Sequence, residues 1–169
     1  DEAARAKIQH PFKVEGARTE YSIARPKLII PYLRIFSENS HIEYPQKLCE
    51  IGTVFTHDEN SQIGVKEEEH LIIATSPGNA TSIKQVIDYV MNLNSLSYEI
   101  HNTTQPMLTE GRVASLIFNK KTIGFMGELH PQTLHNWKIK MPLVVAEIDL
   151  EEIYKNLLGN SQVSKTKVL

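Results

Sequence analysis

Four short segments of β-forming composition follow one another in the second half of this chain, and they constrain its fold more than any other feature. They are residues 98–101, 112–119, 122–128 and 143–150, each bounded by turn-forming or polar residues. Asn119, Lys120 and Lys121 leave room only for a tight turn between the second and the third segment. Strands joined by such short connections pair antiparallel. The sequence therefore predicts a mainly antiparallel sheet.

The first half of the chain predicts one helix and one hairpin. The pattern over residues 25–39 is helical, and Pro31 is best tolerated there if it lies in the first turn. Residues 47–55 and 69–76 are apolar and β-rich, so we expect an antiparallel hairpin between them. The polar residues 56–66 would form its long, mobile loop.

Three further helices complete the prediction. Apolar residues recur at helical spacing from Ile83 to Met91, behind caps at Asn79, Thr81 or Ser82. Residues 131–137 fit a short helix with a proline in its first position, and residues 151–158 fit a closing helix that Gly159 stops. An antiparallel sheet flanked by helices is an α+β layer architecture.

A chain of 169 residues is expected to form one domain with a substantial core. We assign residues 1–19 to an incomplete N-terminal segment, residues 20–158 to the domain and residues 159–169 to a flexible tail. Eighteen Lys and Arg against twenty Asp and Glu give a net charge of −2, with no basic stripe. A platform for direct RNA contact is therefore disfavoured.

Composition also restricts the cellular setting and the chemistry. Cys49 is the only cysteine, which excludes an intramolecular disulfide and a cysteine zinc site. The sequence has no apolar run of the roughly 20 residues that a membrane span needs, and residues 1–10 show no signal-peptide pattern. We expect a soluble, cytoplasmic protein without a membrane partner.

Three blocks of sequence are more specific than secondary structure alone requires. They are YPQK with EIG at residues 44–52, LTEGR at residues 108–112, and IGFMGELHP at residues 123–131 followed by MP and VVAEIDLE at residues 141–151. In this order they resemble the C-terminal part of the phenylalanyl-tRNA synthetase beta subunit of the archaeal and eukaryotic type. The resemblance implies a class II aminoacyl-tRNA synthetase catalytic-like fold and a fragment of a longer subunit. The structural motif residues that it identifies are Glu50, Gly52, Gly111, Arg112, Gly124, Gly127, Glu128 and Pro131.

The resemblance also indicates where catalytic arginines should be found. Class II synthetases clamp ATP with arginines, because guanidinium groups match phosphate oxygens in geometry and charge. Active members carry an Arg-x-Glu pattern on the first strand of the motif 2 hairpin; here Glu50 is present, but Leu48 takes the arginine position, and Lys47 would point to the opposite face. No arginine follows Arg112, so the motif 3 arginine is missing as well. We expect no catalytic, cofactor-binding or metal-binding residues.

By this resemblance the chain is part of a phenylalanine–tRNA ligase, which joins phenylalanine to its tRNA using ATP and Mg²⁺ bound in the holoenzyme. The fragment would pair with the catalytic alpha subunit of an α2β2 assembly and meet tRNA only through it. The alternative is a domain that keeps its own adenylate or amino-acid pocket.

The partner surface is expected on the helix within residues 25–39. Its apolar residues span an arc of about 220°, whereas a helix packed on a sheet alone needs little more than about 100°. A second chain, either the alpha subunit or another copy of the isolated fragment, would cover the excess. The predicted interface residues are Leu28, Ile30, Leu33, Ile35 and Phe36.

A few other residues invite chemical interpretations. Glu147 and Asp149 share one face of a predicted strand and could form a metal or acid–base pair, but a solvated strand face is preferred. Cys49 is expected to be a small buried hydrophobe. The seven histidines lack zinc-site spacing. A bulge or a close backbone approach is expected at the strand glycines Gly52, Gly124 and Gly127.

Overall fold

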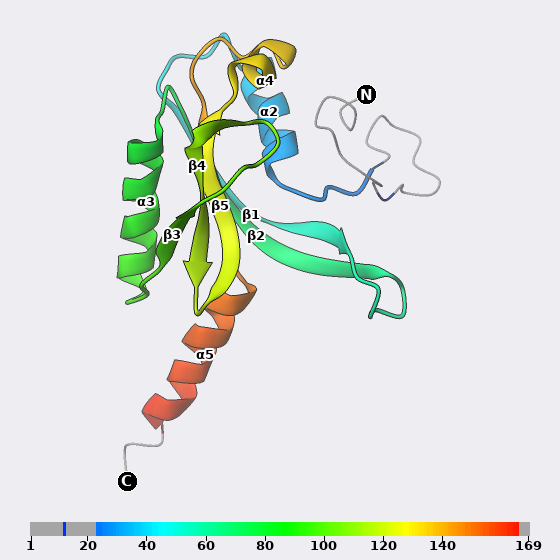
Figure 1. Ribbon diagram of the computed structural model, residues 1–169, viewed down its shortest axis with the longest axis vertical. Helices are drawn as coiled ribbons and strands as arrows, with labels where there is room; N and C mark the ends of the chain where they lie inside the picture. The colour runs from blue at the N-terminus through cyan, green and yellow to red at the C-terminus, as the bar shows by residue number, and fades with distance from the viewer. Residues whose placement is uncertain (1–11, 13–22, 166–169) are drawn as a thin grey trace.

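The fold is a single antiparallel sheet with helices on both faces. The structure, a computed structural model, describes residue 12 and residues 23–165, except for the side chains of residues 160–165. In this part of the chain six strands lie in the order β1-β2-β6-β5-β4-β3, and all neighbours are antiparallel (Figure 1). The strands are β1 (Gln46–His57), β2 (Val65–Ser76), β3 (Glu99–Asn102), β4 (Leu108–Phe118), β5 (Lys121–Leu129) and β6 (Val144–Asp149). The predicted α+β class is confirmed.

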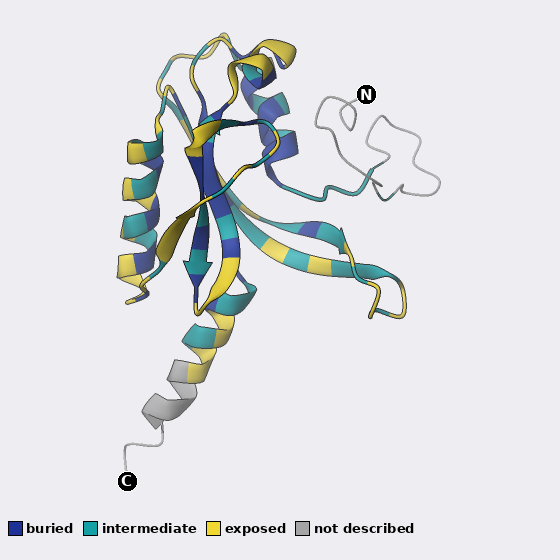
Figure 2. Cartoon of the chain, viewed as in Figure 1, coloured by how far each residue is buried: buried dark blue, intermediate teal, exposed yellow. Residues whose placement is uncertain are grey.

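Two helices lie on opposite faces of this sheet, and each closes a hydrophobic core (Figure 1). Helix α2 (Ile29–Glu38) packs on one face together with the segment around α4 (Pro131–Asn136). Helix α3 (Ala80–Leu93) and the start of α5 (Glu151–Lys165) pack on the other. Alternate residues of the strands β2, β4, β5 and β6 serve the two cores, because successive side chains in a strand point to opposite faces. Figure 2 shows the burial concentrated where the helices meet the central strands.

The hairpin of β1 and β2 differs from the prediction in its length. β2 pairs with β6 only from His70 to Thr75, so the distal parts of the hairpin extend beyond the sheet as a two-stranded arm (residues 53–57 and 65–69, Figure 1). The predicted loop over residues 56–66 is too long, since only residues 58–64 connect the strands. Polar side chains pair across the arm, where Thr56 Oγ1 donates to Glu68 at 3.0 Å. Sequence polarity was therefore a poor guide to the strand ends.

The starts of the helices agree with local sequence signals, but the end of the last helix does not. Pro31 lies in the first turn of α2, as predicted, where a missing N–H costs no intrahelical hydrogen bond. Asn79 caps α3, and its side chain and that of Ser82 form a capping box. The predicted stop at Gly159 is wrong, because α5 continues to Lys165. Glycine ends helices readily in the left-handed conformation, but inside a helix it costs only about 1 kcal/mol.

The assigned N-terminal segment, residues 1–19, lies outside the described residues apart from Phe12, and the last part of the assigned tail, residues 166–169, does too. Among the described helices, none combines the length and the apolar composition that a membrane crossing requires.

Candidate functional site

A buried carboxylate stands at the centre of the sheet face that α2 covers. Glu147 of β6 is only 2% exposed. Its Oε1 accepts the backbone N–H of Leu28 at 2.9 Å, and its Oε2 accepts that of Ile29 at 3.0 Å. These N–H groups belong to the start of α2, where helical donors have no partner of their own and the helix dipole is positive. Glu147 therefore anchors the start of α2 to the sheet.

His70 completes the surroundings of this carboxylate. It lies on β2, and its Nδ1 is 2.9 Å from Glu147 Oε1. When the carboxylate is ionised it only accepts hydrogen bonds, and the imidazole is then the donor in this contact. The expectation of a solvated face is thus wrong for Glu147. The sequence contains a usable signal, since Glu147 is the only charged residue within the otherwise apolar run at residues 143–148.

Arg25 forms a second polar contact on the same face, at the edge strand β1. Its Nη1 lies 3.0 Å from Glu50 Oε1, and its Nε donates to the carbonyl of Thr53 at 2.8 Å. A Cβ at Gly52 would collide with this guanidinium, so the glycine provides the space that Arg25 occupies. The close approach predicted at Gly52 is made by an arginine side chain. Sequence reasoning missed this partner of Glu50.

Tyr32 lies beside the same contact. Burial, and then the negative charge of Glu50, raise the pKa of the Tyr32 phenol to about 12. The hydroxyl is therefore neutral across the physiological range and is a poor candidate for acid–base catalysis.

The strands β1 and β2 offer no arginine on this face to bind a phosphate. Leu48 packs against the core under α2, whereas Lys47 is exposed on the opposite face, as its position in the strand predicts. Neither β1, β2 nor α5 contains an arginine. Arg25, the arginine of this face that the structure describes, is held by Glu50 and Thr53.

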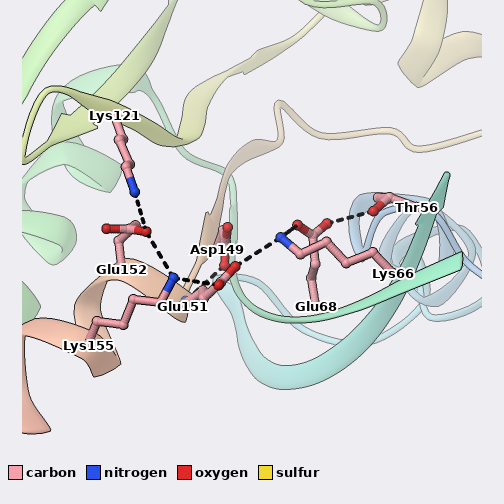
Figure 3. Close-up of polar contacts among 8 residues, drawn as sticks. All are labelled: Thr56, Lys66, Glu68, Lys121, Asp149, Glu151, Glu152 and Lys155. Carbon is pink, nitrogen blue, oxygen red and sulfur yellow. Dashed lines mark hydrogen bonds and ion pairs between the residues drawn. The ribbon is translucent and has the colours of Figure 1, made fainter. Parts of the chain in front are cut away.

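A separate acidic group lies at the end of β6. Ligand atoms of Glu68, Asp149 and Glu151 lie within 4.8 Å of one another. However, Lys66 Nζ lies 2.7 Å from Glu68 and 2.9 Å from Glu151, so an ammonium already supplies the positive charge (Figure 3). Asp149 Oδ1 accepts the N–H of Glu151 at the start of α5. Asp149 and Glu147 therefore belong to different networks, and the paired role considered for them is wrong.

Lysines also surround the other acids at this end. The contacts of Lys155 and then Lys66 lower the pKa of the Glu151 carboxyl to about 2. Glu152 pairs with Lys121 at 2.7 Å and lies 3.3 Å from Lys155 (Figure 3). This is an ion-pair network that ties β2, β5 and α5 together.

The remaining motif residues have structural roles. Arg112 is exposed and pairs with Glu128 at 2.7 Å, while the other Glu128 oxygen accepts the Ala80 N–H at the start of α3. Burial opposes the ionisation of Glu128, but the contacts with Arg112 and Ala80 lower its pKa overall. Gly111 has a φ of 75°, which favours glycine, and Pro131 is the first residue of α4, as predicted.

Gly124 and Gly127 lie where another backbone comes close, as predicted. A Cβ at Gly127 would stand 2.9 Å from the Arg112 carbonyl oxygen and 3.0 Å from Val113 Cα. A Cβ at Gly124 would collide with the Glu147 carbonyl oxygen. Both glycines therefore let neighbouring strands approach in the middle of the sheet.

The predicted partner surface on α2 is largely inside the domain. The proposed excess of apolar surface is covered by the chain itself, because Trp137, Ile139 and Leu143, after α4, join the same core. The inference that a second chain must cover it is therefore wrong. Ile35 is partly exposed, and its contact with a partner stays a prediction. The predicted interface residues that are buried in this core are Leu28, Ile30, Leu33 and Phe36.

Cys49 is also placed differently from its prediction. It is exposed, because it lies on the face of the edge strand β1 that points away from the α2 core.

The fold and its central face define the class of protein. The chain is similar to pyrrolysyl-tRNA synthetase from Desulfitobacterium hafniense, with a TM-score of 0.73 and 14% identity over 94% of this chain and 59% of that chain. A structure of PylSc, a pyrrolysyl-tRNA synthetase from the same organism, gives a TM-score of 0.68 and 13% identity over 88% and 54% of the two chains. The domain thus has the class II aminoacyl-tRNA synthetase fold.

The family within this class follows from sequence. The family model for the phenylalanyl tRNA synthetase beta chain CLM domain matches residues 2–150, and this chain belongs to that family. The phenylalanine–tRNA ligase beta subunit of Thermococcus kodakarensis is 36% identical over 137 residues, which are 80% of this chain and 24% of that protein. The phenylalanine–tRNA ligase beta subunit of Methanococcoides burtonii is 34% identical over 143 residues, which are 83% of this chain and 25% of that protein. The chain spans about a quarter of the length of these relatives.

Proposed function

We propose that this chain is the catalytic-like but non-catalytic domain in the beta subunit of a phenylalanine–tRNA ligase, where it supports the catalytic alpha subunit. The observation that carries the proposal is the occupation of the sheet face by α2 and Glu147. On this face a carboxylate takes the helix-terminal N–H groups of Leu28 and Ile29.

Electrostatics favours this function over ATP binding. A triphosphate is strongly anionic and requires arginines, lysines, metal ions or free backbone N–H groups around it. Here the helix-terminal donors already bind Glu147, and Arg25 already binds Glu50. A nucleotide would have to displace one anion and stand beside another. Because these donors and Arg25 are already occupied, the alternative of a residual adenylate pocket is disfavoured as well.

Within the proposed ligase, ATP, Mg²⁺, phenylalanine and the reacting end of the tRNA are bound by the alpha subunit, in a cytoplasmic α2β2 assembly. The support for an alpha partner is the family itself, since the relatives are beta subunits. The contribution of this domain is a folded surface against which the partner packs.

Phenylalanine-dependent ATP–pyrophosphate exchange tests the lack of catalysis. We expect the purified chain to give no exchange above a heat-denatured control, and the alpha subunit assembled with the beta subunit to give robust exchange. Exchange by the chain alone would replace the proposal with a catalytic one.

Calorimetric titration of the chain with ATP and with phenylalanine tests the alternative. We expect no saturable heat from either ligand. Saturable binding that is lost when Arg25 is replaced by Ala would establish a pocket on this face instead.

A further inference from the structure

We draw no further inference here: the strongest candidate, the outer edge of strand β1 at the exposed residues Lys47, Cys49 and Ile51, carries nothing, because nothing in the part of the chain that the structure describes shows what covers it.

Discussion

Glu147 and Leu28 are 119 positions apart in the sequence, yet the carboxylate of the first accepts the backbone N–H of the second at 2.9 Å. This contact joins the last strand of the sheet to the first described helix. It replaces the N-cap side chain that α2 lacks, because Leu28, at the cap position, makes no side-chain hydrogen bond there.

Removing this carboxylate should destabilise the domain strongly. Glu147→Ala leaves two backbone donors without an acceptor in a buried site, at about 1–3 kcal/mol for each unsatisfied group. Glu147→Gln keeps one acceptor and should lose less. Urea unfolding measures both, with exposed Glu67→Ala as a control expected within about 0.5 kcal/mol of wild type. Equal stability of Glu147→Ala and wild type would refute the anchoring role.

Gly127→Val should lower the free energy of unfolding by more than the roughly 1 kcal/mol of an average substitution. The new side chain would press on the Arg112 carbonyl and on Val113, both fixed in the neighbouring strand. Gly159→Ala is the contrasting variant, because α5 has open space there and alanine favours a helix by about 1 kcal/mol. Thermal unfolding should rank the proteins with Gly127→Val lowest and Gly159→Ala highest; any other order contradicts the packing argument.

The Asn79 cap of α3 should contribute about 0.5–2 kcal/mol, as such caps do in other proteins. Asn79→Ala removes the acceptor of the Ser82 N–H and should lower stability by that amount in chemical denaturation. Thr81→Ala, at an exposed position one residue into the helix, should have little effect. A loss from Thr81→Ala as large as that from Asn79→Ala would contradict the capping role, because alanine is the stronger helix former at position 81.

Acid should weaken the ion-pair network around Glu151. Its pKa is about 2 in the folded chain, below the ordinary value of 4.5, so its ionised form favours the folded state. That stability is fully present above about pH 4.5 and is lost as the pH falls toward 2. The effect is small because the groups are partly exposed. Carboxyl NMR titration should place Glu151 near pH 2, and Lys66→Met should raise that value; an unchanged titration would exclude the contact.

Local signals in the sequence were sufficient for most of the fold. The β-forming composition and the short connections in the second half predicted the antiparallel strands, and Asn119 and Lys120 do form the turn between β4 and β5, both with positive φ. Pro31 lies in the first turn of α2, as predicted, and of the three caps considered for α3 the structure shows Asn79. Each of these features depends on residues that are close together in the sequence. A local sequence pattern is therefore enough to predict it.

The site required contacts that no local pattern encodes. Glu147 was expected on a solvated face because most charged residues are exposed; its burial comes from α2, more than a hundred residues earlier. The partner of Glu50 is Arg25, 25 positions away, and the cover of the α2 core comes from the segment after α4. Cys49 is exposed because β1 is an edge strand, which depends on strand order rather than on composition.

The long separation between α2 and its anchor also sets an order of events during synthesis. Ile29 leaves the ribosome 118 residues before Glu147. At about 5–20 residues per second, that interval is roughly 6–24 seconds. During that time neither Glu147 nor strand β6 has been synthesised. The apolar side chains of α2 therefore have no sheet to pack against. We therefore expect α2 to dock late, when β6 enters the sheet, so the domain closes as a unit rather than growing outward from its first helix.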